Sequence, residues 1–231
     1  MDIYISHSVG CAGWDMPGIY QGTKFKNACR TWRYKEPDRG IVKMLDWDYR
    51  EYEKRGDVVR DRHLTIARED TGIEVVMSMD LWDHNAEECF RFTDELIKTT
   101  GARVLIPVHA YPPGVEEYDL AYPNANWFAK NVPIPVELRA NIKHILGGSP
   151  HGQMKICLGR GFFKNFHGKV VNTGLPGVKS VDGNQIFNVA VRVGKYWQPS
   201  RPFWIKPRKK EDNQTIFARS VKNLDEAWKK W

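Results

Sequence analysis

The chain has 231 residues, of which 42% are hydrophobic and 27% are charged, and this composition is typical of a folded globular protein. No apolar run approaches the ~20 residues that a membrane-spanning helix needs, and no signal peptide is present, so we expect a protein of the reducing cytoplasm. The net charge of +7 favours a polyanionic partner. The four cysteines are scattered without a Cys-x-x-Cys pair, which argues against a thiolate zinc site.

Apolar runs alternate with charged or amphipathic segments along most of the chain, although the stretch up to about Gly40 is irregular and rich in glycine and aromatic residues. The pattern predicts strands at residues 2–6, 40–45, 73–79, 103–108, 142–146, 154–158 and 178–181. It predicts helices at residues 49–69, 86–97, 127–130 and 136–141, from 185 onward, and at 215–231.

Strands that alternate with helices indicate a parallel sheet. About seven or eight predicted strands each enter a polar loop, which favours a TIM-like (β/α)8 barrel, regular or incomplete, over a doubly wound sheet. We therefore expect one α/β domain over 1–231, with its core at about 40–197, a basic segment at 201–212 and a C-terminal helix. No glycine-rich nucleotide-binding fingerprint occurs in the sequence.

Candidate ligand-binding residues directly follow five of the predicted strands. In a barrel, the C-terminal ends of the strands meet at one mouth, where the chemistry takes place. Three carboxylates around such a mouth can divide nucleophilic attack, proton transfer and substrate recognition. A carboxylate suits attack at an anomeric carbon, because it stabilises an oxocarbenium-like centre. These residues are Asp46, Asp80, His109, the pair Gly147-Gly148, and Asp182.

Each of these residues also has a purely structural interpretation. Asp46, Asp80 and Asp182 could cap the helices that follow them, because aspartate is common at helix N-termini. His109 could be a core histidine. The repeated placement at strand ends is what favours a functional site.

The ordered set of motifs resembles the tRNA-guanine transglycosylase family over about residues 40–197. The chain lacks that family's zinc subdomain, and its motifs are more closely spaced. It is therefore most similar to the compact branch that exchanges guanine in DNA for a 7-deazaguanine. The matching segments are Met-Leu-Asp46, Val-Val-Met-Ser-Met-Asp80, Ile-Pro-Val-His109, Ile-Leu-Gly-Gly148 and Gly-Val-Lys-Ser-Val-Asp182.

The resemblance implies a role for each strand-end residue. Asp182 would attack C1′ of a guanosine nucleotide and form a covalent intermediate, and Asp46 would assist proton transfer. The exchanged base would be held by Asp80, His109, Gly147 and Gly148. Because the target base must leave the stack, base flipping is expected. Stacking candidates are Trp47, Trp82 and Tyr111, and further pocket or backbone contacts are His151, Gln153 and Asn184.

The resemblance and the positive charge together imply a nucleic-acid partner. The missing zinc subdomain favours DNA over tRNA, with a 7-deazaguanine as the small substrate, in the cytoplasm of a bacterium or a phage-infected cell. No metal, organic cofactor or membrane is expected. The sequence leaves open whether a second copy of the chain or an accessory protein takes part. Phosphate contacts, which would make binding salt-dependent, are predicted for Arg160, Lys164, Lys169, Lys206, Arg208, Lys209 and Lys210.

Three other functions stay open at this point. The substrate could be tRNA. The protein could be a metal-dependent barrel hydrolase that uses His109, His144 and His151, although no His-x-His pair supports this interpretation. It could also be a non-catalytic protein that binds nucleic acid through charge and aromatic side chains alone.

Overall fold

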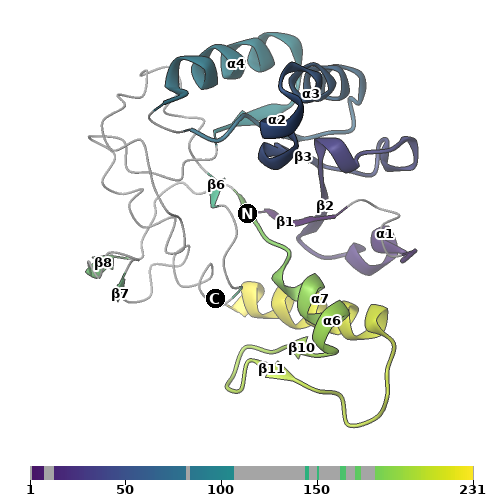
Figure 1. The fold of residues 1–231 in the computed structure, drawn as a ribbon. Coiled ribbons are helices and arrows are strands. Elements are labelled where there is room, and N and C mark those ends of the chain that lie inside the picture. Colours follow the sequence, from purple (N-terminus) through teal and green to yellow (C-terminus); the bar gives the residue numbers. More distant parts are fainter. Residues whose placement is uncertain are drawn as a thin grey trace.

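The computed structural model describes residues 2–7, 13–81, 84–106, 150 and 183–230, and the backbone of four short strands at 144–145, 162–164, 170–172 and 180–182 (Figure 1). The described residues form a mixed α/β fold around a seven-stranded sheet with the order β5-β4-β3-β2-β1-β9-β6. All neighbouring strands in this sheet are parallel. The strands are β1 (Asp2–Ser6), β2 (Phe25–Arg30), β3 (Met44–Asp46), β4 (Val75–Met77), β5 (Arg103–Leu105), β6 (His144–Ile145) and β9 (Ser180–Asp182).

Helices and two antiparallel hairpins surround the sheet. In Figure 1, α2, α3 and α4 lie at the top of the view, and α6 and α7 lie at the bottom beside the β10–β11 hairpin. The helices are α1 (Met16–Tyr20), α2 (Tyr49–Arg55), α3 (Asp57–Glu69), α4 (Ala86–Thr99), α6 (Gln185–Val193) and α7 (Asn213–Lys230). The hairpins pair β7 (Phe162–Lys164) with β8 (Val170–Asn172), and β10 (Tyr196–Trp197) with β11 (Trp204–Ile205). The short 3-10 helices are η1 (Thr31–Arg33) and η2 (Glu36–Asp38).

One face of the sheet is apolar and packs against the helices. Ile3 and Ile5 of β1 line a small cavity together with Ile186 of α6 and Leu224 of α7. Further along the same sheet, the Ser78 hydroxyl after β4 lies 2.8 Å from that of Thr93 on α4. Because alternate residues of a strand point to opposite faces and residues in register share a face, this apolar face is defined across the sheet. Its other members include Phe25, Cys29, Leu45, Val76 and Val104.

The opposite face carries polar and charged side chains, and we call it the inner face. The register pairs Tyr4 with Lys26, and Arg30 with Asp46. Near the amino end of the strands, Lys26 forms an ion pair with Asp2 at 3.3 Å. Burial raises the pKa of the Tyr4 phenol, and the Asp2 and Glu74 carboxylates raise it further. The inner face therefore combines buried apolar residues with charges that pair with one another.

Glycine conformation sets two of the helix boundaries. Gly56 has a φ of 55°, which divides the charged stretch after β3 into α2 and α3. Gly194 adopts the left-handed conformation (φ 64°) and ends α6, as glycine commonly does just beyond a helix. None of the helices in the described ranges combines the length and the apolar character needed to cross a bilayer.

The sequence patterns predicted several elements correctly. The first strand has the predicted bounds, and α4, α6 and α7 lie where amphipathic periodicity indicated helices. Strands β4, β5 and β6 lie inside the predicted runs, and β9 ends one residue later than predicted. The predicted elements at 127–130, 136–141 and 154–158 lie outside the described residues.

The structure corrects one prediction about the first third of the chain and refines the bounds of two others. The segment before Gly40 is not irregular, because it contains α1, β2 and two 3-10 helices. The strand predicted at 40–45 is β3, and it begins only at Met44. The predicted helix at 49–69 is two helices. Alternating polar residues in Phe25–Arg30 concealed β2, since its Lys26 and Arg30 lie on the polar inner face.

Candidate functional site

Asp46 lies at the carboxyl end of β3, on the inner face, and is only 8% exposed. The Ser6 hydroxyl of β1 donates to its Oδ2 at 3.4 Å, and Arg30 Nε of β2 lies 3.5 Å from the same oxygen. The hydroxyl of Thr31 also donates to the backbone carbonyl of Asp46 at 3.1 Å. Neighbouring strands therefore fix both the backbone and the carboxylate of Asp46.

Asp182 ends β9, the strand on the other side of β1, where its backbone lies in register with Tyr4. The next residue, Gly183, donates its amide to the Tyr4 carbonyl at 3.0 Å, so the chain stays attached to β1 beyond the strand. Helix α6 then begins at Gln185. In the order β9-β1-β2-β3, two strands separate the two that end in Asp182 and Asp46.

None of the three candidate aspartates is the N-cap of the helix that follows it. The N-cap of α2 is Asp48, that of α4 is Asn85 and that of α6 is Asn184. Asp46, Asp80 and Asp182 lie two or more residues earlier, at or just beyond the strand ends. The helix-capping alternative therefore does not explain these carboxylates.

The other predicted residues near this edge have different surroundings. Asp80 is partly buried three residues after β4, and its carbonyl accepts a hydrogen bond from the Asn85 side chain at 2.8 Å. Asn184 is exposed. Trp47 was predicted to stack on a base, and this prediction was wrong. Its ring is 5% exposed and packs between α2, α3 and α4, with centroid distances of 5.1–5.2 Å to Tyr52, His63 and Phe92.

Several predicted contacts cannot be placed. Lys164 belongs to β7, of which only the backbone is described. Outside the described residues lie Trp82, His109, Tyr111, Gly147, Gly148, His151, Gln153, Arg160 and Lys169.

Arg30 and Ser6 are the residues of this edge that the sequence interpretation missed. Ser6 ends β1, a strand that was predicted, whereas Arg30 ends β2, which was not predicted and lies in register with Asp46 of β3. The signal for β2 was the short run Phe25-Lys-Asn-Ala-Cys-Arg30, where Lys26 and Arg30 fall on one face and Phe25 and Cys29 on the other.

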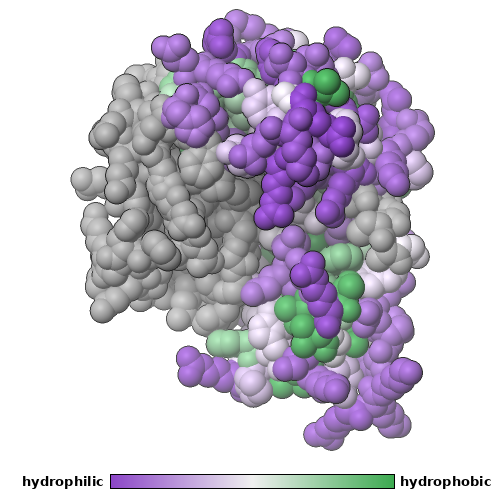
Figure 2. Space-filling model, viewed as in Figure 1, coloured by the Kyte–Doolittle hydropathy of each residue, from purple (hydrophilic) through white to green (hydrophobic). Residues whose placement is uncertain are grey.

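Three of the four predicted basic residues in the 201–212 segment line one cavity, which we call the basic cavity. It lies between the β10–β11 hairpin and α7 and has a volume of about 530 Å3. Lys206, Arg208 and Lys209 line it and are exposed, as is the neighbouring Lys210. In Figure 2 the loop from β11 to α7, at the lower right, is strongly hydrophilic. The other lining residues are Tyr196, Gln198, Ile205, Glu211 and Arg219.

Trp197 anchors this hairpin to α7. It is 1% exposed, its amide donates to the Ser220 hydroxyl at 2.8 Å, and its carbonyl accepts from the Asn223 side chain at 2.8 Å. On the cavity side, Arg219 lies 4.7 Å from the Tyr196 ring centroid and pairs with Glu211 at 2.8 Å. The walls of the basic cavity are therefore fixed by packing and by hydrogen bonds from α7.

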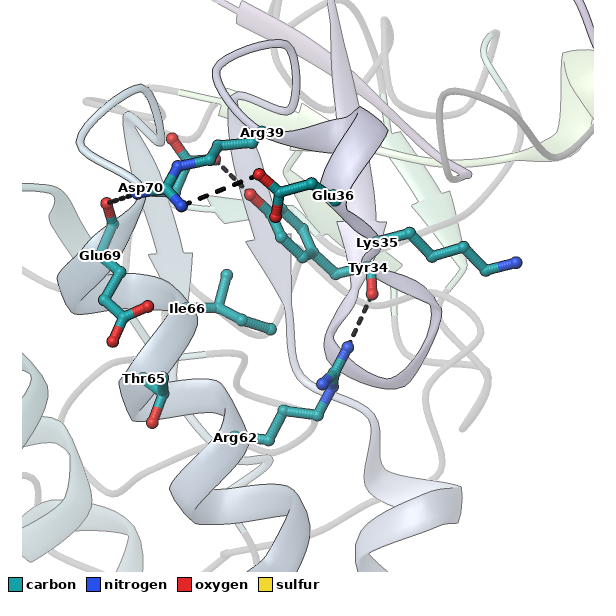
Figure 3. A pocket seen from close by; sticks show the side chains of 9 residues that line it. All are labelled: Tyr34, Lys35, Glu36, Arg39, Arg62, Thr65, Ile66, Glu69 and Asp70. Carbon is teal, nitrogen blue, oxygen red and sulfur yellow. Dashed lines mark hydrogen bonds and ion pairs between the residues drawn. The ribbon is translucent and has the colours of Figure 1, made fainter.

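A second cavity, of about 270 Å3, lies between η2 and α3 (Figure 3). Two of its arginines and its aspartate are already engaged with the protein. Arg62 donates to the Tyr34 carbonyl at 2.7 Å, Arg39 donates to the Glu69 carbonyl at 3.2 Å, and the Tyr34 hydroxyl donates to Asp70 at 2.6 Å. The cavity is lined by three basic and three acidic residues, so its charges balance. The cavity is a structural junction between η2 and α3.

Comparison with known protein families gives one match. A model of a family of unknown function, DUF6610, matches residues 16–229. The chain belongs to this family. No curated protein and no solved structure matches it.

The described part of this DUF6610 protein contains no group of three or more His, Cys, Asp or Glu residues that could hold a metal ion. His63 shows how a buried histidine is used in this fold. It is fully buried against Trp47 and Phe92, and burial lowers its pKa to about 3. The ring is therefore neutral at physiological pH, and its Nδ1 is hydrogen-bonded with the Thr31 hydroxyl. His63 is a core residue of the DUF6610 fold.

Proposed function

We propose that this DUF6610 protein is a base-exchange transglycosylase that replaces guanine in DNA with a 7-deazaguanine. The observation that carries the proposal is the pair of carboxylate residues, Asp46 and Asp182, at the carboxyl ends of strands in one parallel sheet. Neither residue caps a helix, and Asp46 is held in place by Arg30 and Ser6. Ligand chemistry in parallel α/β proteins occurs at this edge.

The sheet supports a TIM-like (β/α)8 barrel as the architecture of the proposed enzyme. Strand order follows chain order from β1 to β5, and the late strand β9 returns to lie beside β1. Side-chain contacts with α1, α4, α6 and α7 fall on one face only, whereas helices cover both faces of a doubly wound sheet. In a closed barrel the inner face would surround the axis, and Asp46 would line the mouth.

In the first half of the proposed reaction, a carboxylate oxygen of Asp182 attacks C1′ of the target nucleotide. The C1′–N9 bond breaks, and its electron pair moves to the guanine. Asp46 relays a proton to the departing base, which leaves as neutral guanine. An ester between Asp182 and C1′ remains, as in other enzymes that use a carboxylate as the nucleophile on a sugar.

The second half reverses these steps with the new base. The 7-deazaguanine loses its N9 proton to Asp46, and its nitrogen attacks C1′. The bond between C1′ and the Asp182 oxygen breaks, which restores the carboxylate. The incoming base brings the proton that the outgoing base removed, so the exchange needs no oxidant, reductant or cofactor. Asp80, His109 and the Gly147-Gly148 pair remain the proposed contacts to the base.

DNA is the proposed polymer, on the resemblance to the compact branch of the transglycosylase family. The positive charge of the 201–212 segment supports a nucleic-acid substrate, because phosphate contacts supply most of the sequence-independent affinity. A tRNA substrate is an outcome that the test below distinguishes.

The proposal is tested by measuring the release of labelled guanine. Wild-type protein and Asp182→Ala are incubated with 7-cyano-7-deazaguanine and DNA labelled in its guanines, in parallel with tRNA labelled in the same way. We expect free labelled guanine only with wild type and DNA. Asp61→Asn, a substitution of an exposed aspartate on α3, is the matched control and should release guanine at the wild-type rate.

Release by Asp182→Ala at the wild-type rate would contradict the role of Asp182. If wild type bound DNA but released no guanine, the result would favour the alternative of a non-catalytic nucleic-acid-binding protein. Release from tRNA alone would move the protein to the other branch of the family.

A further inference from the structure

The basic cavity concentrates positive charge at one place on the described surface. Lys206, Arg208 and Lys209 form no ion pair with any carboxylate in the described part of the chain. On α3 and α4, by contrast, Arg60 pairs with Glu95 and Lys98 pairs with Asp94. Unpaired, closely spaced cations repel one another, so their surroundings favour a bound anion.

The cavity is also built to hold those cations near one place. Arg219 is fixed between the Tyr196 ring and Glu211, so its guanidinium has little freedom to lose when a ligand binds. The four basic lining residues outnumber the one acidic residue, Glu211. The Tyr196 ring and Gln198 add surfaces suited to a sugar or a base. This chemistry matches the phosphate backbone of a nucleic acid.

Helix α6 separates the basic cavity from the end of β9. Asp182 precedes the first turn of α6, whereas Tyr196 follows its last turn. A helix of nine residues is about 13 Å long at ~1.5 Å per residue. Successive phosphates of one strand in a DNA duplex advance about 3.4 Å along the axis. The length of α6 therefore corresponds to about four base pairs at most along a DNA axis.

We infer that the basic cavity binds DNA backbone phosphates outside the exchanged guanine, on one side of it. This inference rests on the proposed function for the position of the reacting nucleotide, but the phosphate-binding site stands on the cavity alone. It adds Arg219 and Tyr196 to the DNA contacts and gives the protein a minimum substrate length.

The test compares a cavity variant with wild type on duplexes of decreasing length. The variant carries Lys206→Gln, Arg208→Gln and Lys209→Gln. The control carries Arg68→Gln, Arg91→Gln and Lys98→Gln, which remove the same charge from exposed positions on α3 and α4. The duplexes place a central guanine between flanks of two to twelve base pairs. DNA affinity is measured by fluorescence anisotropy at several salt concentrations, and thermal unfolding confirms that both variants fold.

We expect the cavity variant to bind the longest duplex at least about tenfold more weakly than wild type, with a salt slope reduced by about 1 for each lost phosphate contact. Wild type should lose this affinity as the flank that reaches the cavity is shortened, while the cavity variant should be insensitive to that shortening. The control variant should follow wild type.

Equal losses of affinity in the cavity and control variants would overturn the inference, because net charge alone would then explain binding. The same dependence on flank length in wild type and the cavity variant would also overturn it, as would tighter binding of RNA than of DNA. A cavity-dependent affinity for DNA with no guanine release from any duplex would support the phosphate site and contradict the proposed function.

Discussion

The inner face of the sheet and the basic cavity use positive charge in opposite ways. On the inner face, Arg30 lies against Asp46, and Lys26 lies against Asp2. In the basic cavity, Lys206, Arg208 and Lys209 have no carboxylate within ion-pair distance in the described part of the chain. Residues 195–210 contain six Lys and Arg and no Asp or Glu, so this short segment holds most of an excess charge of +7.

This difference indicates a division of work between the two regions. Paired charges on the inner face position a carboxylate for chemistry, since each partner restrains the other. Unpaired charges in the cavity are free to neutralise phosphates, which changes affinity and its dependence on salt. Changes on the inner face should therefore alter the rate of base exchange, and changes in the cavity should alter DNA binding.

The largest effect is expected where the cavity is attached to the fold. Trp197→Ala removes a buried indole and should lower the free energy of unfolding by about 3–5 kcal/mol. It should also weaken DNA binding although every cation is retained, because the hairpin loses the buried indole that packs it into the core beside α7. Urea denaturation and DNA titration measure both effects. Trp204→Ala, at a partly exposed position, should lower the free energy of unfolding less. Equal decreases for the two variants would show that Trp197 is not the anchor.

The next effect concerns the inner face. Asp46→Asn keeps the shape of the side chain but removes its capacity to carry a proton, and should lower the rate of guanine release by about a hundredfold. DNA affinity should stay within about twofold of wild type, because Asp46 contacts no phosphate in the proposed mechanism. Kinetics under single-turnover conditions separate the two quantities. A loss of DNA affinity with an unchanged rate of guanine release would contradict the division of work between the inner face and the basic cavity.

Acidification should destabilise the fold through His63. The pKa of this histidine is lowered by burial to about 3 in the folded chain, from an ordinary value of 6.5. Below pH 6.5 the His63 side chain binds a proton in the unfolded chain but not in the folded chain. The contribution of His63 to the free energy of unfolding is therefore complete above that pH and falls as the pH decreases. Between pH 7.5 and 5.0 the loss should be about 2 kcal/mol, at ~1.4 kcal/mol per pH unit below 6.5. Urea unfolding at both pH values measures it. His63→Gln should reduce the loss, and equal losses would contradict a neutral His63.

The smallest effect is expected for a paired surface cation. Arg60→Ala breaks the ion pair with Glu95 and should change the free energy of unfolding by at most about 1 kcal/mol. It should leave DNA affinity unchanged at every salt concentration. If Arg60→Ala weakened DNA binding as much as the loss of Lys206 does, pairing would not distinguish the two kinds of cation.

The strands and helices with regular apolar periodicity could be predicted from the sequence, and so could the aspartates at their ends. β2 could not, because three of its six residues are polar and it faces a polar interior on one side. The function of Trp47 was misjudged for a related reason. Its position next to Asp46 suggested the mouth of the site, but alternation along the strand turns its ring to the helix-covered face.

The basic cavity shows what sequence proximity does and does not reveal. Lys206, Arg208 and Lys209 are close in the chain, so their charge was evident. Arg219 and Tyr196 come from α7 and β10, and only the packing of Trp197 on α7 brings them to the same cavity. Contacts between distant segments depend on the fold, which local patterns do not encode.

The most direct test of the proposed function is a search for the covalent intermediate. Wild-type protein and Asp182→Ala are mixed with a guanine-containing duplex, quenched in acid and denatured, and the protein mass is measured. We predict that a fraction of wild type carries the mass of the DNA strand without one guanine, attached to the peptide that contains Asp182. Asp182→Ala should carry none. Exchange of the base without any such adduct, or an adduct on another residue, would contradict the account.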